Sequence, residues 1–502
     1  MAGAKLPTRA MSESGPSFFA RIERFADSWL VLAGILLLTF GVYARTLDGW
    51  FRADDFWLLQ SARDTGLGRF ILEAFDFRDT DPVPQFPFYR PLYVISFKIA
   101  HGLFGLNAMA YHALSVSLHL GSVTLVWFIM RRFISLPIAS AAATAIFALH
   151  PAYAGTVTWI ARGNMLMATF VYLVTFLLFL KYTDGGRYQR AWYAASVIGF
   201  AAAVLYHPIT VTLVVVLPAV VFLAKGRPEE AVRPRSWLPF VPFILIAIAI
   251  TVLQVWVRRE YGVDQVFGFG WHQYTRYGEY LGIAALPILR RDWADLHLVN
   301  PEYQQMVQGL ASVLMIAIGL FLLDRRRWPY VGVFAVLWLF TSLAPNSTTV
   351  VWAAIPAQLY LPGVSLGLFL VLAGQLIWGS ITPALSERAK HVALGCVGAG
   401  AFVVVGLMIF GTVVHQGHTL DDSHENERFI AQLQEEVQGL EPGGTLYILN
   451  PPFNLRVFSI DALVSAVNLY LGEFEVFLIK PGEADELQAT LGPNEAIFRH
   501  RP

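Results

Sequence analysis

Two adjacent carboxylates, Asp54 and Asp55, stand in the stretch Phe51-Arg52-Ala53-Asp54-Asp55-Phe56-Trp57. A long apolar run ends just before it, near Leu47, so the pair is expected where the chain leaves a membrane. A carboxylate at the edge of hydrocarbon loses hydration, which disfavours its charged form and raises its basicity. The pattern therefore predicts a general base held at a fixed depth beside lipid head groups.

The same two residues also fit the beginning of a helix. An Asp placed before Phe56-Trp57-Leu58-Leu59 can accept hydrogen bonds from the backbone N–H groups that a first helical turn leaves without partners. Only one of the two can occupy the cap position, so both interpretations can hold together. We expect at least one carboxylate to be catalytic or to bind substrate, because charge at this depth is costly and usually functional.

Two arginines are candidates for binding a phosphate group. Arg90 precedes Pro91 at the start of a short apolar segment, and Arg162 follows Trp159-Ile160-Ala161. A guanidinium group presents paired N–H donors that match the oxygens of a phosphate. The alternative is that each arginine extends its charge to a lipid head group. Arg162 is the lone cation of the short outer loops, which favours the phosphate there, whereas Arg90 fits both interpretations equally.

The sequence gives little sign of a metal centre. His112, His119, His150 and His207 lie on or near apolar runs, where a single His more often bonds a neighbouring helix than a metal. The chain lacks an HExxH motif, and its single Cys excludes a disulfide framework or a Cys-based site. A divalent cation at Asp54 and Asp55 stays open, although two ligands are too few to argue for one.

The composition indicates a membrane protein. Of the 502 residues 56% are hydrophobic and only 14% are charged, and the mean hydropathy is +0.53. A soluble domain is about a quarter charged. The net charge of zero gives no reason to expect nucleic acid as a partner. About eleven apolar runs approach the length that a bilayer core requires: 29–47, 111–130, 136–150, 164–182, 190–206, 208–224, 238–257, 306–323, 329–344, 359–378 and 391–411.

The charges of the loops predict an orientation. Cytoplasmic loops carry the excess of Lys and Arg, and alternate short loops of this chain hold Arg131-Arg132, Lys225 and Arg325-Arg326-Arg327. The polar segment 1–28 is then cytoplasmic. The carboxylate pair and the C-terminal tail are outside, and the membrane is expected to be a bacterial inner membrane.

The predicted fold is an all-α polytopic membrane protein with a small C-terminal α/β domain outside. Residues 29–411 form the membrane domain, with long outer loops at 48–110 and 258–305, and residues 412–502 form the outer domain. Within the first loop, the segment 92–104 is too short to span and predicts a helix in the membrane surface. The outer domain is expected to contain a polar helix from about Asp421, a strand at 445–449, a helix at 461–471 and a strand at 473–479.

The position of the carboxylate pair restricts the chemistry. The chain lacks a Walker or GxGxxG motif, and a nucleotide donor is not expected on the outer side. A transferase acting there needs an activated donor that has already crossed the membrane, and a polyprenyl-phosphate sugar meets that need. Its phosphate is a good leaving group, so the reaction requires one base, with arginines balancing charge on the departing phosphate.

The order of several short motifs resembles the GT-C superfamily of membrane glycosyltransferases, and within it the protein O-mannosyltransferase-like group whose animal members carry tetratricopeptide repeats. The similar segments are Ala53-Asp54-Asp55-Phe56, Tyr89-Arg90-Pro91-Leu92, Tyr111 to His119, Leu149-His150-Pro151 through Asn164, and Leu359-Tyr360-Leu361-Pro362. The resemblance covers roughly residues 29–378 and implies a catalytic Asp at position 54 or 55, a lipid-phosphate sugar donor and inversion at the anomeric carbon.

We therefore predict an inverting glycosyltransferase. Asp54 or Asp55 is the base, Arg90 and Arg162 bind the carrier phosphate, and His207, Gln358 and Tyr360 line the donor pocket. The acceptor hydroxyl belongs to a protein, a lipid or a polysaccharide.

Two further hypotheses belong to different classes. Tyr206-His207-Pro208 and Pro356-Ala357-Gln358 stand where many relatives carry Lys-Glu and Glu-Arg. The missing charges favour a catalytically silent scaffold that keeps the fold to hold a lipid carrier or a partner. A transporter is disfavoured, because the predicted spans contain few charges and no internal repeat.

Overall fold

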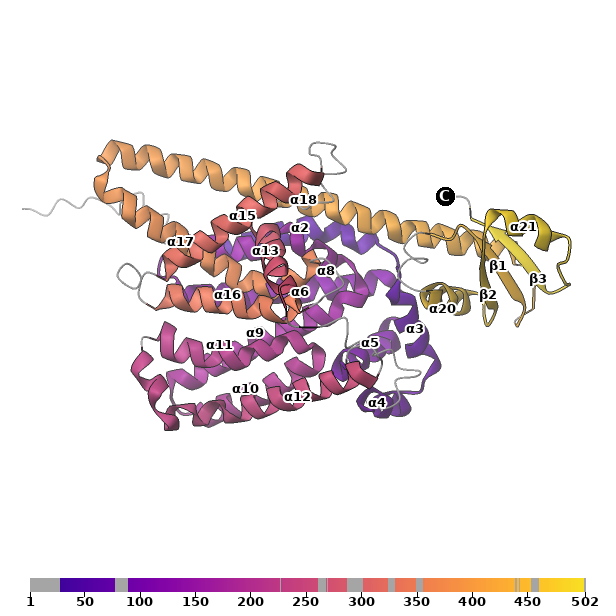
Figure 1. Ribbon diagram of the computed structural model, residues 1–502, viewed down its shortest axis with the longest axis horizontal. Coiled ribbons are helices and arrows are strands. Elements are labelled where there is room, and N and C mark those ends of the chain that lie inside the picture. Colours follow the sequence, from indigo (N-terminus) through magenta and orange to yellow (C-terminus); the bar gives the residue numbers. More distant parts are fainter. Residues whose placement is uncertain are drawn as a thin grey trace, which may run out of the picture.

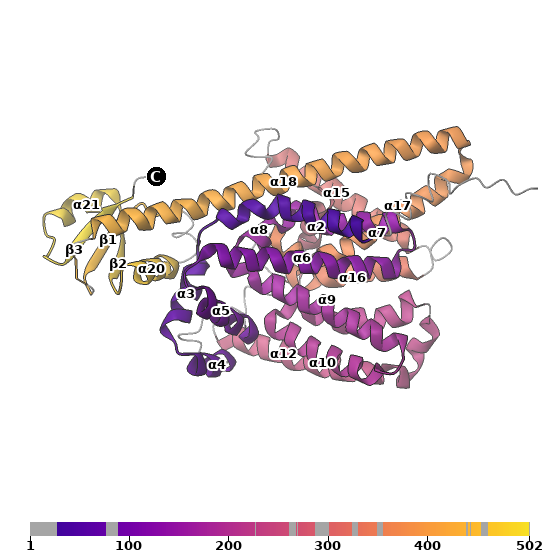
Figure 2. The ribbon, with the colours of Figure 1, turned by 180° about the vertical axis from the view of Figure 1, so that it is seen from behind.

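The computed structural model describes residues 28–76, 89–225, 227–260, 268, 270–286, 301–323, 330–348, 355–437, 440–441, 443–452 and 460–500. Long helices lie side by side, and a small α/β unit projects from one end of this bundle (Figures 1 and 2). The first elements are α2 (Trp29–Tyr43), η1 (Ala44–Asp48), α3 (Asp54–Asp64), α4 (Leu67–Phe75), α5 (Pro91–Phe104), α6 (Ala108–Phe133), α7 (Pro137–Leu149), η2 (Pro151–Tyr153), α8 (Ala154–Thr158), η3 (Ile160–Arg162), α9 (Gly163–Asp184) and α10 (Gln189–Tyr206).

The second half of the chain continues the bundle and then forms the α/β unit. Its membrane-side elements are η4 (Pro208–Thr212), α11 (Leu213–Ala219), η5 (Val220–Ala224), η6 (Pro228–Val232), η7 (Pro234–Phe240), α12 (Val241–Glu260), α13 (His272–Ala285), α15 (Pro301–Leu322), α16 (Val331–Ser347), η9 (Pro356–Leu359), α17 (Pro362–Ile381), η10 (Thr382–Ala384) and α18 (Glu387–Glu436). The α/β unit consists of β1 (Thr445–Leu449), α20 (Ile460–Tyr470), β2 (Glu475–Ile479), α21 (Pro481–Gln488) and β3 (Glu495–Arg499).

All eleven predicted spans coincide with helical segments. Within the described residues, seven helical stretches are long and apolar enough to cross a membrane: Trp29–Asp48, Ala108–Phe133, Pro137–Thr158, Ile160–Asp184, Pro234–Glu260, Pro362–Ala384 and Glu387–Glu436. Shorter apolar stretches run over Pro208–Ala224, Met306–Leu322 and Val331–Ser347. Large apolar side chains such as Leu37, Leu245 and Phe402 point outward, 71%, 61% and 82% exposed. An apolar outer surface suits lipid, and the protein is a multi-pass membrane protein, as predicted.

Prolines explain why the stretch 208–224 is not one regular helix. Pro208 begins a 3₁₀ turn, and Pro218 lies inside α11. Because Pro has no N–H and its ring crowds the preceding turn, the chain widens into the π-helical segment η5.

The length of α9 places its two ends on opposite sides of the membrane. Its 22 residues span about 33 Å, which matches a bilayer core of about 30 Å. Arg162 immediately precedes it, and Asp184 ends it. At the Asp184 end, Arg132 and Lys225 both form ion pairs with that carboxylate. The loops that contain Arg132 and Lys225, which were predicted to share a side, therefore meet at this end of α9.

The end of the bundle near Asp54 carries the short helices α3, α4 and α5 (Figure 2). The predicted surface segment 92–104 is α5, and Pro91 occupies its first turn, as expected. The aromatic residues of the second outer loop lie on or beside α13, which buries Tyr280 and leaves Trp271, just before its first residue, 85% exposed.

α18 joins two segments that the sequence suggested were separate. The predicted span 391–411 and the predicted polar helix from Asp421 form one helix of 50 residues, about 75 Å long. A change from apolar to polar residues does not break a helix, and this stretch contains no Pro. The predicted boundary between residues 411 and 412 falls inside α18, which runs along the bundle to the α/β unit (Figure 1).

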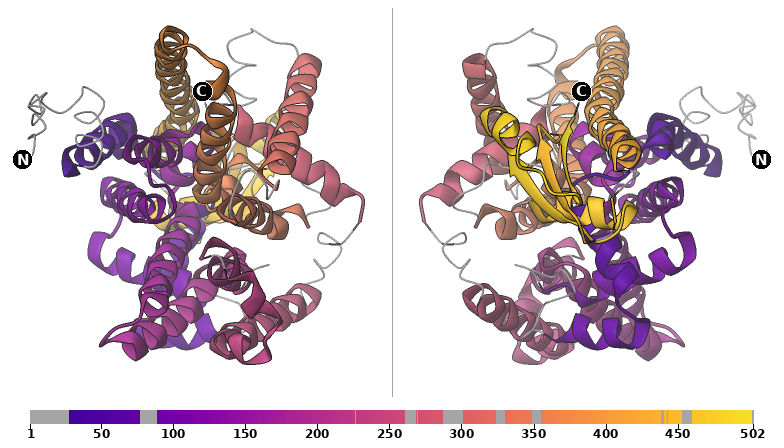
Figure 3. Two further views of the ribbon diagram at one scale, coloured as in Figure 1. Left: turned by 90° about the vertical axis from the view of Figure 1, so that its left-hand side faces the viewer. Right: turned by 90° about the vertical axis from the view of Figure 1, so that its right-hand side faces the viewer.

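The α/β unit has a three-stranded parallel sheet in the order β2-β1-β3. The first predicted strand is confirmed, the helix lies one residue earlier than predicted, and β2 begins two residues later, at Glu475. α21 and β3 were not predicted. Figure 3 shows the sheet lying across the end of the bundle.

One hydrophobic core joins the α/β unit to α3 and α5. It contains Phe56 and Leu59 of α3, Phe97 of α5, Phe429 of α18 and Leu463 of α20. Phe429 also makes an edge contact with Phe498 of β3. The unit is therefore packed against the helix that begins at Asp54, which fixes that helix from its outer side.

Close packing inside the bundle gives a stability prediction. A Cβ at Gly367 of α17 would lie 2.5 Å from the carbonyl oxygen of Ala143 in α7, whereas nothing lies within 4 Å of one at Gly374 on the same helix. We expect Gly367→Ala to push the two helices apart and to cost about 1–3 kcal/mol. Thermal unfolding in detergent should show a clearly lower Tm.

The matched control is Gly374→Ala, which adds the same methyl group to open space. Its Tm should stay at or slightly above that of the wild type, because Ala favours helix over Gly. Equal melting of the two variants would contradict the close approach of α7 and α17.

Candidate functional site

The site begins at a strained turn before α3. Ala53 is fully buried and has φ 45° and ψ −120°, a conformation that residues with a Cβ rarely adopt. The turn is closed by hydrogen bonds from the N–H of Asp55 to the oxygen of Arg52, 3.0 Å, and from the N–H of Phe56 to that of Ala53, 3.2 Å. Such backbone strain persists only where the surroundings hold it, and it concentrates at functional sites.

Asp55 holds two loops together. Its Oδ2 accepts a hydrogen bond from the N–H of Arg52 at 3.0 Å, and its Oδ1 accepts one from the N–H of Ala161 at 2.7 Å. The side chain is 1% exposed. Burial raises the pKa of Asp55 to about 7, while both hydrogen bonds and the charge of Arg52 oppose that rise. Both oxygens bind backbone, but the predicted helix cap is wrong. Ala53 occupies the N-cap position and no side chain caps α3. The N–H groups that Asp55 binds lie before the helix and in a distant segment.

Asp54 is different, because its carboxylate is available. Among the residues that the structure describes, none makes a hydrogen bond to it. Burial raises its pKa above the usual value, and the charges of Arg162 and Arg52 lower it. The carboxylate is therefore more basic than an exposed one, yet it faces two cations.

One aromatic ring carries both of these arginines. The guanidinium carbon of Arg52 lies 4.8 Å from the ring centroid of Trp159, and that of Arg162 lies 4.7 Å from it. A tryptophan ring attracts cations over its face. Trp159 thereby holds two positive charges close to one carboxylate. We call Asp54, Asp55, Arg52 and Arg162 the carboxylate–arginine cluster.

A second group of cations adjoins this cluster. Arg90 precedes α5, and Gln254 of α12 fixes the neighbouring residue by bonding both the N–H and the oxygen of Tyr89, at 3.4 and 2.7 Å. Burial lowers the pKa of Arg90 to about 10; Tyr93 opposes this shift, while Arg258 and Arg162 add to it. Arg90 is still charged at neutral pH. We call Arg90, Arg258 and His207 the outer arginine group.

His207 supplies a neutral donor to this group. Burial, together with the charges of Arg90 and Arg258, lowers its pKa well below the usual value. Its Nδ1 accepts a hydrogen bond from the N–H of Ile209 at 3.1 Å. The proton of the neutral ring is therefore on Nε2, which can donate to an anion.

The remaining predicted pocket residues separate. Gln358 accepts a hydrogen bond from the hydroxyl of Tyr280, a residue whose charge interaction with Arg162 places it beside the cluster. Tyr360 is fully buried elsewhere: its hydroxyl bonds Nδ1 of His119 at 2.9 Å, and its ring packs on Phe147. The structure thus corrects the placement of Tyr360. Gln358 lies in η9 and Tyr360 immediately follows it, and the two side chains bond different partners.

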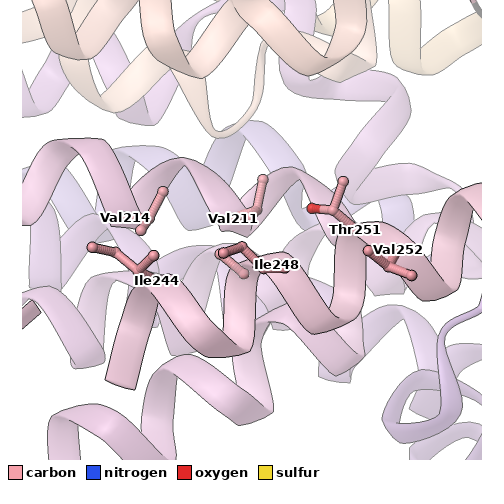
Figure 4. A pocket seen from close by; sticks show the side chains of 7 residues that line it. Val211, Val214, Ile244, Ile248, Thr251 and Val252 are labelled. Carbon is pink, nitrogen blue, oxygen red and sulfur yellow. The ribbon is translucent and has the colours of Figure 1, made fainter. Parts of the chain in front are cut away.

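An apolar groove leads away from the outer arginine group. It has a volume of about 320 Å³ and lies between the stretch 208–219 and α12 (Figure 4). Its lining residues are Val211, Val214, Ile244, Ala247, Ile248, Thr251 and Val252. His207 lies one turn before Val211, and Arg258 lies less than two turns after Val252. Both walls of the groove therefore lead to this cationic group.

The cluster is a poor cation site. No group of three or more metal-binding side chains occurs in the described part of the chain. Of the two carboxylates predicted as possible ligands, Asp55 already binds two backbone donors, and both face arginines. The arrangement suits an anion.

Sequence reasoning missed several residues of the site. Arg52 stood in the motif but received no role, and Trp159 was quoted only as a neighbour of Arg162. Arg258 was visible as a cation at the outer end of a predicted span. Asp422, whose Oδ2 lies 2.8 Å from a guanidinium nitrogen of Arg52, is 370 residues away in sequence, and nothing local signals that contact.

Together these features define a multi-pass helical membrane protein with a buried, cation-rich polar site at one membrane surface. Comparison with protein-family models gives no match. The chain is 29% identical over 155 residues to protein O-mannosyl-transferase Tmtc1 of Drosophila melanogaster. It is 30% identical over 167 residues to protein O-mannosyl-transferase TMTC1 of Mus musculus. The matches cover 30% and 31% of this chain, and only 18% of the length of either relative. The predicted resemblance to that group is confirmed.

Two solved structures are also similar. ArnT from Cupriavidus metallidurans, bound to undecaprenyl phosphate, aligns with 94% of this chain and 89% of its own, at 16% identity and a TM-score of 0.46. The oligosaccharyltransferase of Archaeoglobus fulgidus, tethered to an acceptor peptide, aligns with 90% of this chain and 64% of its own, at 12% identity and a TM-score of 0.48.

The different bonding of the two carboxylates predicts different effects on stability. Asp55→Ala leaves the N–H groups of Arg52 and Ala161 buried without their acceptor, which costs roughly 1–3 kcal/mol for each. Asp54→Ala removes no such bond. We expect a large fall in Tm for Asp55→Ala and little change for Asp54→Ala when both are melted at one pH. Equal losses would contradict the division of roles.

Proposed function

We propose that the protein is an inverting glycosyltransferase that moves a sugar from a polyprenyl-phosphate carrier to an acceptor hydroxyl on the outer face of the membrane. One observation carries the proposal: the available carboxylate of Asp54 lies beside two arginines held on Trp159, next to a second cationic group. The similarity to protein O-mannosyl-transferases supports sugar transfer as the reaction.

The grouping of cations supports a phosphate as ligand. The charges of Arg52 and Arg162 act on Asp54, Arg90 interacts with Arg162 and Arg258, and Asp422 pairs with Arg52. Guanidinium groups match the oxygens of a phosphate, and Nε2–H of His207 adds a hydrogen bond.

The groove supports a lipid-linked donor. A phosphate at the outer arginine group leaves the isoprenoid chain free to lie between the stretch 208–219 and α12, along Val211, Ile248 and Val252 (Figure 4). Because lipid is as apolar as these side chains, moving the isoprenoid chain into the groove gains little hydrophobic free energy. The groove instead adds packing contacts and sets the orientation of the chain.

The chemistry requires little beyond these groups. The acceptor oxygen attacks the anomeric carbon from the side opposite the phosphate, and the bond between that carbon and the phosphate oxygen breaks. Asp54 takes the proton of the attacking hydroxyl, and its raised pKa makes it a better base. The bonding electrons leave with the phosphate, whose negative charge the arginines stabilise.

Asp55 has a supporting part in this proposal. Its two backbone hydrogen bonds keep the turn before α3 against the segment that carries Trp159 and Arg162. The loop charges and the length of α9 support the outer side as the location of the site.

A catalytically silent carrier-binding protein is the second candidate. His207 and Gln358 occupy positions where many relatives carry charged residues, and Gln358 is tied to Tyr280. This alternative predicts binding of the carrier phosphate without sugar transfer, so the two candidates differ in a single measurement.

Substitution of the base tests the first candidate. Purified protein in lipid is incubated with radiolabelled polyprenyl-phosphate sugars and a membrane extract as acceptor. We expect transfer by the wild type and a fall of about 10²- to 10⁴-fold in Asp54→Asn, because a positioned base contributes that much.

The control is Asp64→Asn at the end of the same helix, where the carboxylate is bonded to Arg63 on the surface. This variant should keep full transfer. Retained turnover in Asp54→Asn would refute the assignment of the base. Carrier binding by a wild type that transfers no sugar would establish the silent alternative.

Filling the groove tests where the carrier chain lies. Ile248→Trp places a large ring in the groove, while Leu245→Trp adds the same ring to an outward-facing part of α12. We expect the KM for a long-chain donor to rise about three- to tenfold, or up to ~1.4 kcal/mol, in Ile248→Trp alone.

A sugar donor with a ten-carbon isoprenoid provides the internal comparison, because its chain is too short to occupy the whole groove. Its KM should change little in either variant. An equal increase for both donors, or the same increase in Leu245→Trp, would place the chain elsewhere.

A further inference from the structure

The turn before α3 is held by a distant part of the chain. Residues 422–426 of α18 contact residues 48–52 in four places. Three contacts are to backbone: Ser423 Oγ accepts from the N–H of Trp50 at 3.2 Å, Asn426 Nδ2 donates to the oxygen of Phe51 at 3.3 Å, and His424 Nε2 donates to the oxygen of Asp48 at 2.9 Å.

The fourth contact reaches the site itself. Asp422 Oδ2 accepts a hydrogen bond from Nη2 of Arg52 at 2.8 Å, and the two side chains are only 26% and 10% exposed. The other side of this guanidinium is the ring of Trp159, 4.8 Å away. Arg52 therefore has a fixed direction, set by one carboxylate and one aromatic ring.

We propose that Asp422 is a positioning residue, which by holding and neutralising Arg52 keeps the Asp54 carboxylate basic and so couples the outer part of α18 to sugar transfer. The inference rests on the proposed function for its catalytic part, whereas the effect on Asp54 rests on the contact of Asp422 with Arg52 and on the charge that Arg52 exerts on Asp54. The positive charge of Arg52 acts on two carboxylates, Asp54 and Asp422. The more of this charge is neutralised by Asp422, the less it stabilises the ionised form of Asp54, and the more basic Asp54 becomes.

Among the described residues, the charged and titratable groups that act on Asp54 are few enough to separate. They are Arg52 from the preceding turn, Arg162 from η3, Asp55 from α3 itself and Tyr93 from α5. Asp422 acts on Asp54 through Arg52. Removing its charge leaves Arg162, Asp55 and Tyr93 in place and changes only how much of the positive charge of Arg52 falls on Asp54.

The test measures the protonation of Asp54 directly. Infrared difference spectra of the full-length protein in liposomes follow the carboxyl band that is lost in Asp54→Asn. In Asp422→Asn we expect the midpoint of this titration to fall by roughly half to one pH unit, because Arg52 is no longer shared with a second carboxylate.

The matched control is Asp421→Asn, which removes the same charge from the exposed neighbouring position on α18. Its midpoint should equal that of the wild type. Asp422→Glu keeps the negative charge, so the midpoint of this variant should lie close to the wild-type value. If Asp422→Asn caused only a general loss of packing, the Tm would fall but the midpoint of the Asp54 titration would stay at the wild-type value. If Asp422→Asn does not fold, Asp422→Ser provides a smaller side chain with the same loss of charge.

Sugar transfer then separates the two ideas. We expect the acid limb of the pH profile of Asp422→Asn to move to lower pH with the titration, and kcat to fall about three- to tenfold with little change in donor KM. Equal midpoints in Asp422→Asn and Asp421→Asn would refute the positioning role. A shifted midpoint in a protein whose wild type transfers no sugar would leave the positioning role intact and refute the proposed function.

Discussion

The cost of keeping charge away from water governs the outer end of this protein. Asp55 is almost fully buried, and it survives there because two backbone N–H groups, from Arg52 and Ala161, bind its oxygens. Those two bonds join segments more than a hundred residues apart and hold the turn that includes the strained Ala53. Trp159, Arg162 and Asp54 owe their relative positions to this junction.

A division of labour between neighbours follows from the same constraint. Asp54 and Asp55 are adjacent and chemically identical, yet one has both oxygens occupied by backbone and the other has neither. The helix geometry points successive side chains about 100° apart, so Asp55 faces the junction while Asp54 faces Arg52 and Arg162 without a backbone bond. Charge pairing alone does not distinguish the two carboxylates. The hydrogen bonds do, because both oxygens of Asp55 are bound to backbone N–H groups, whereas those of Asp54 are available.

Local patterns were enough to predict most of the helices, but not which segments pack against one another. Hydropathy predicted a helix at each of the eleven apolar runs, because burial in lipid depends on composition along a single run. Seven of these runs lie in helical stretches long and apolar enough to cross a membrane, and Pro91 correctly marked the start of α5. The continuity of α18 was missed because the change in polarity near residue 412 resembles a domain boundary, although a helix needs no constant polarity.

The site shows the same limit. The pairing of Arg52 with Asp422 and the stacking of two arginines on Trp159 depend on how distant segments pack. Tyr360 shows the converse: it lies two residues from Gln358, but it faces His119 in the core. Closeness in the sequence gave no information about the direction in which each side chain points.

The uninterrupted course of α18 has a consequence for how such a chain can change over time. Each residue of a helix advances the chain by about 1.5 Å and turns it by about 100°. A single insertion or deletion between the membrane and Asp422 would therefore rotate every later contact off its partner, including those to Trp50, Phe51 and Arg52. A flexible linker can change in length without moving the segments that follow it, but in a continuous helix each added or removed residue changes both the distance and the rotation of those segments. The number of residues in this part of α18 is thus as constrained as the identity of any side chain in the site.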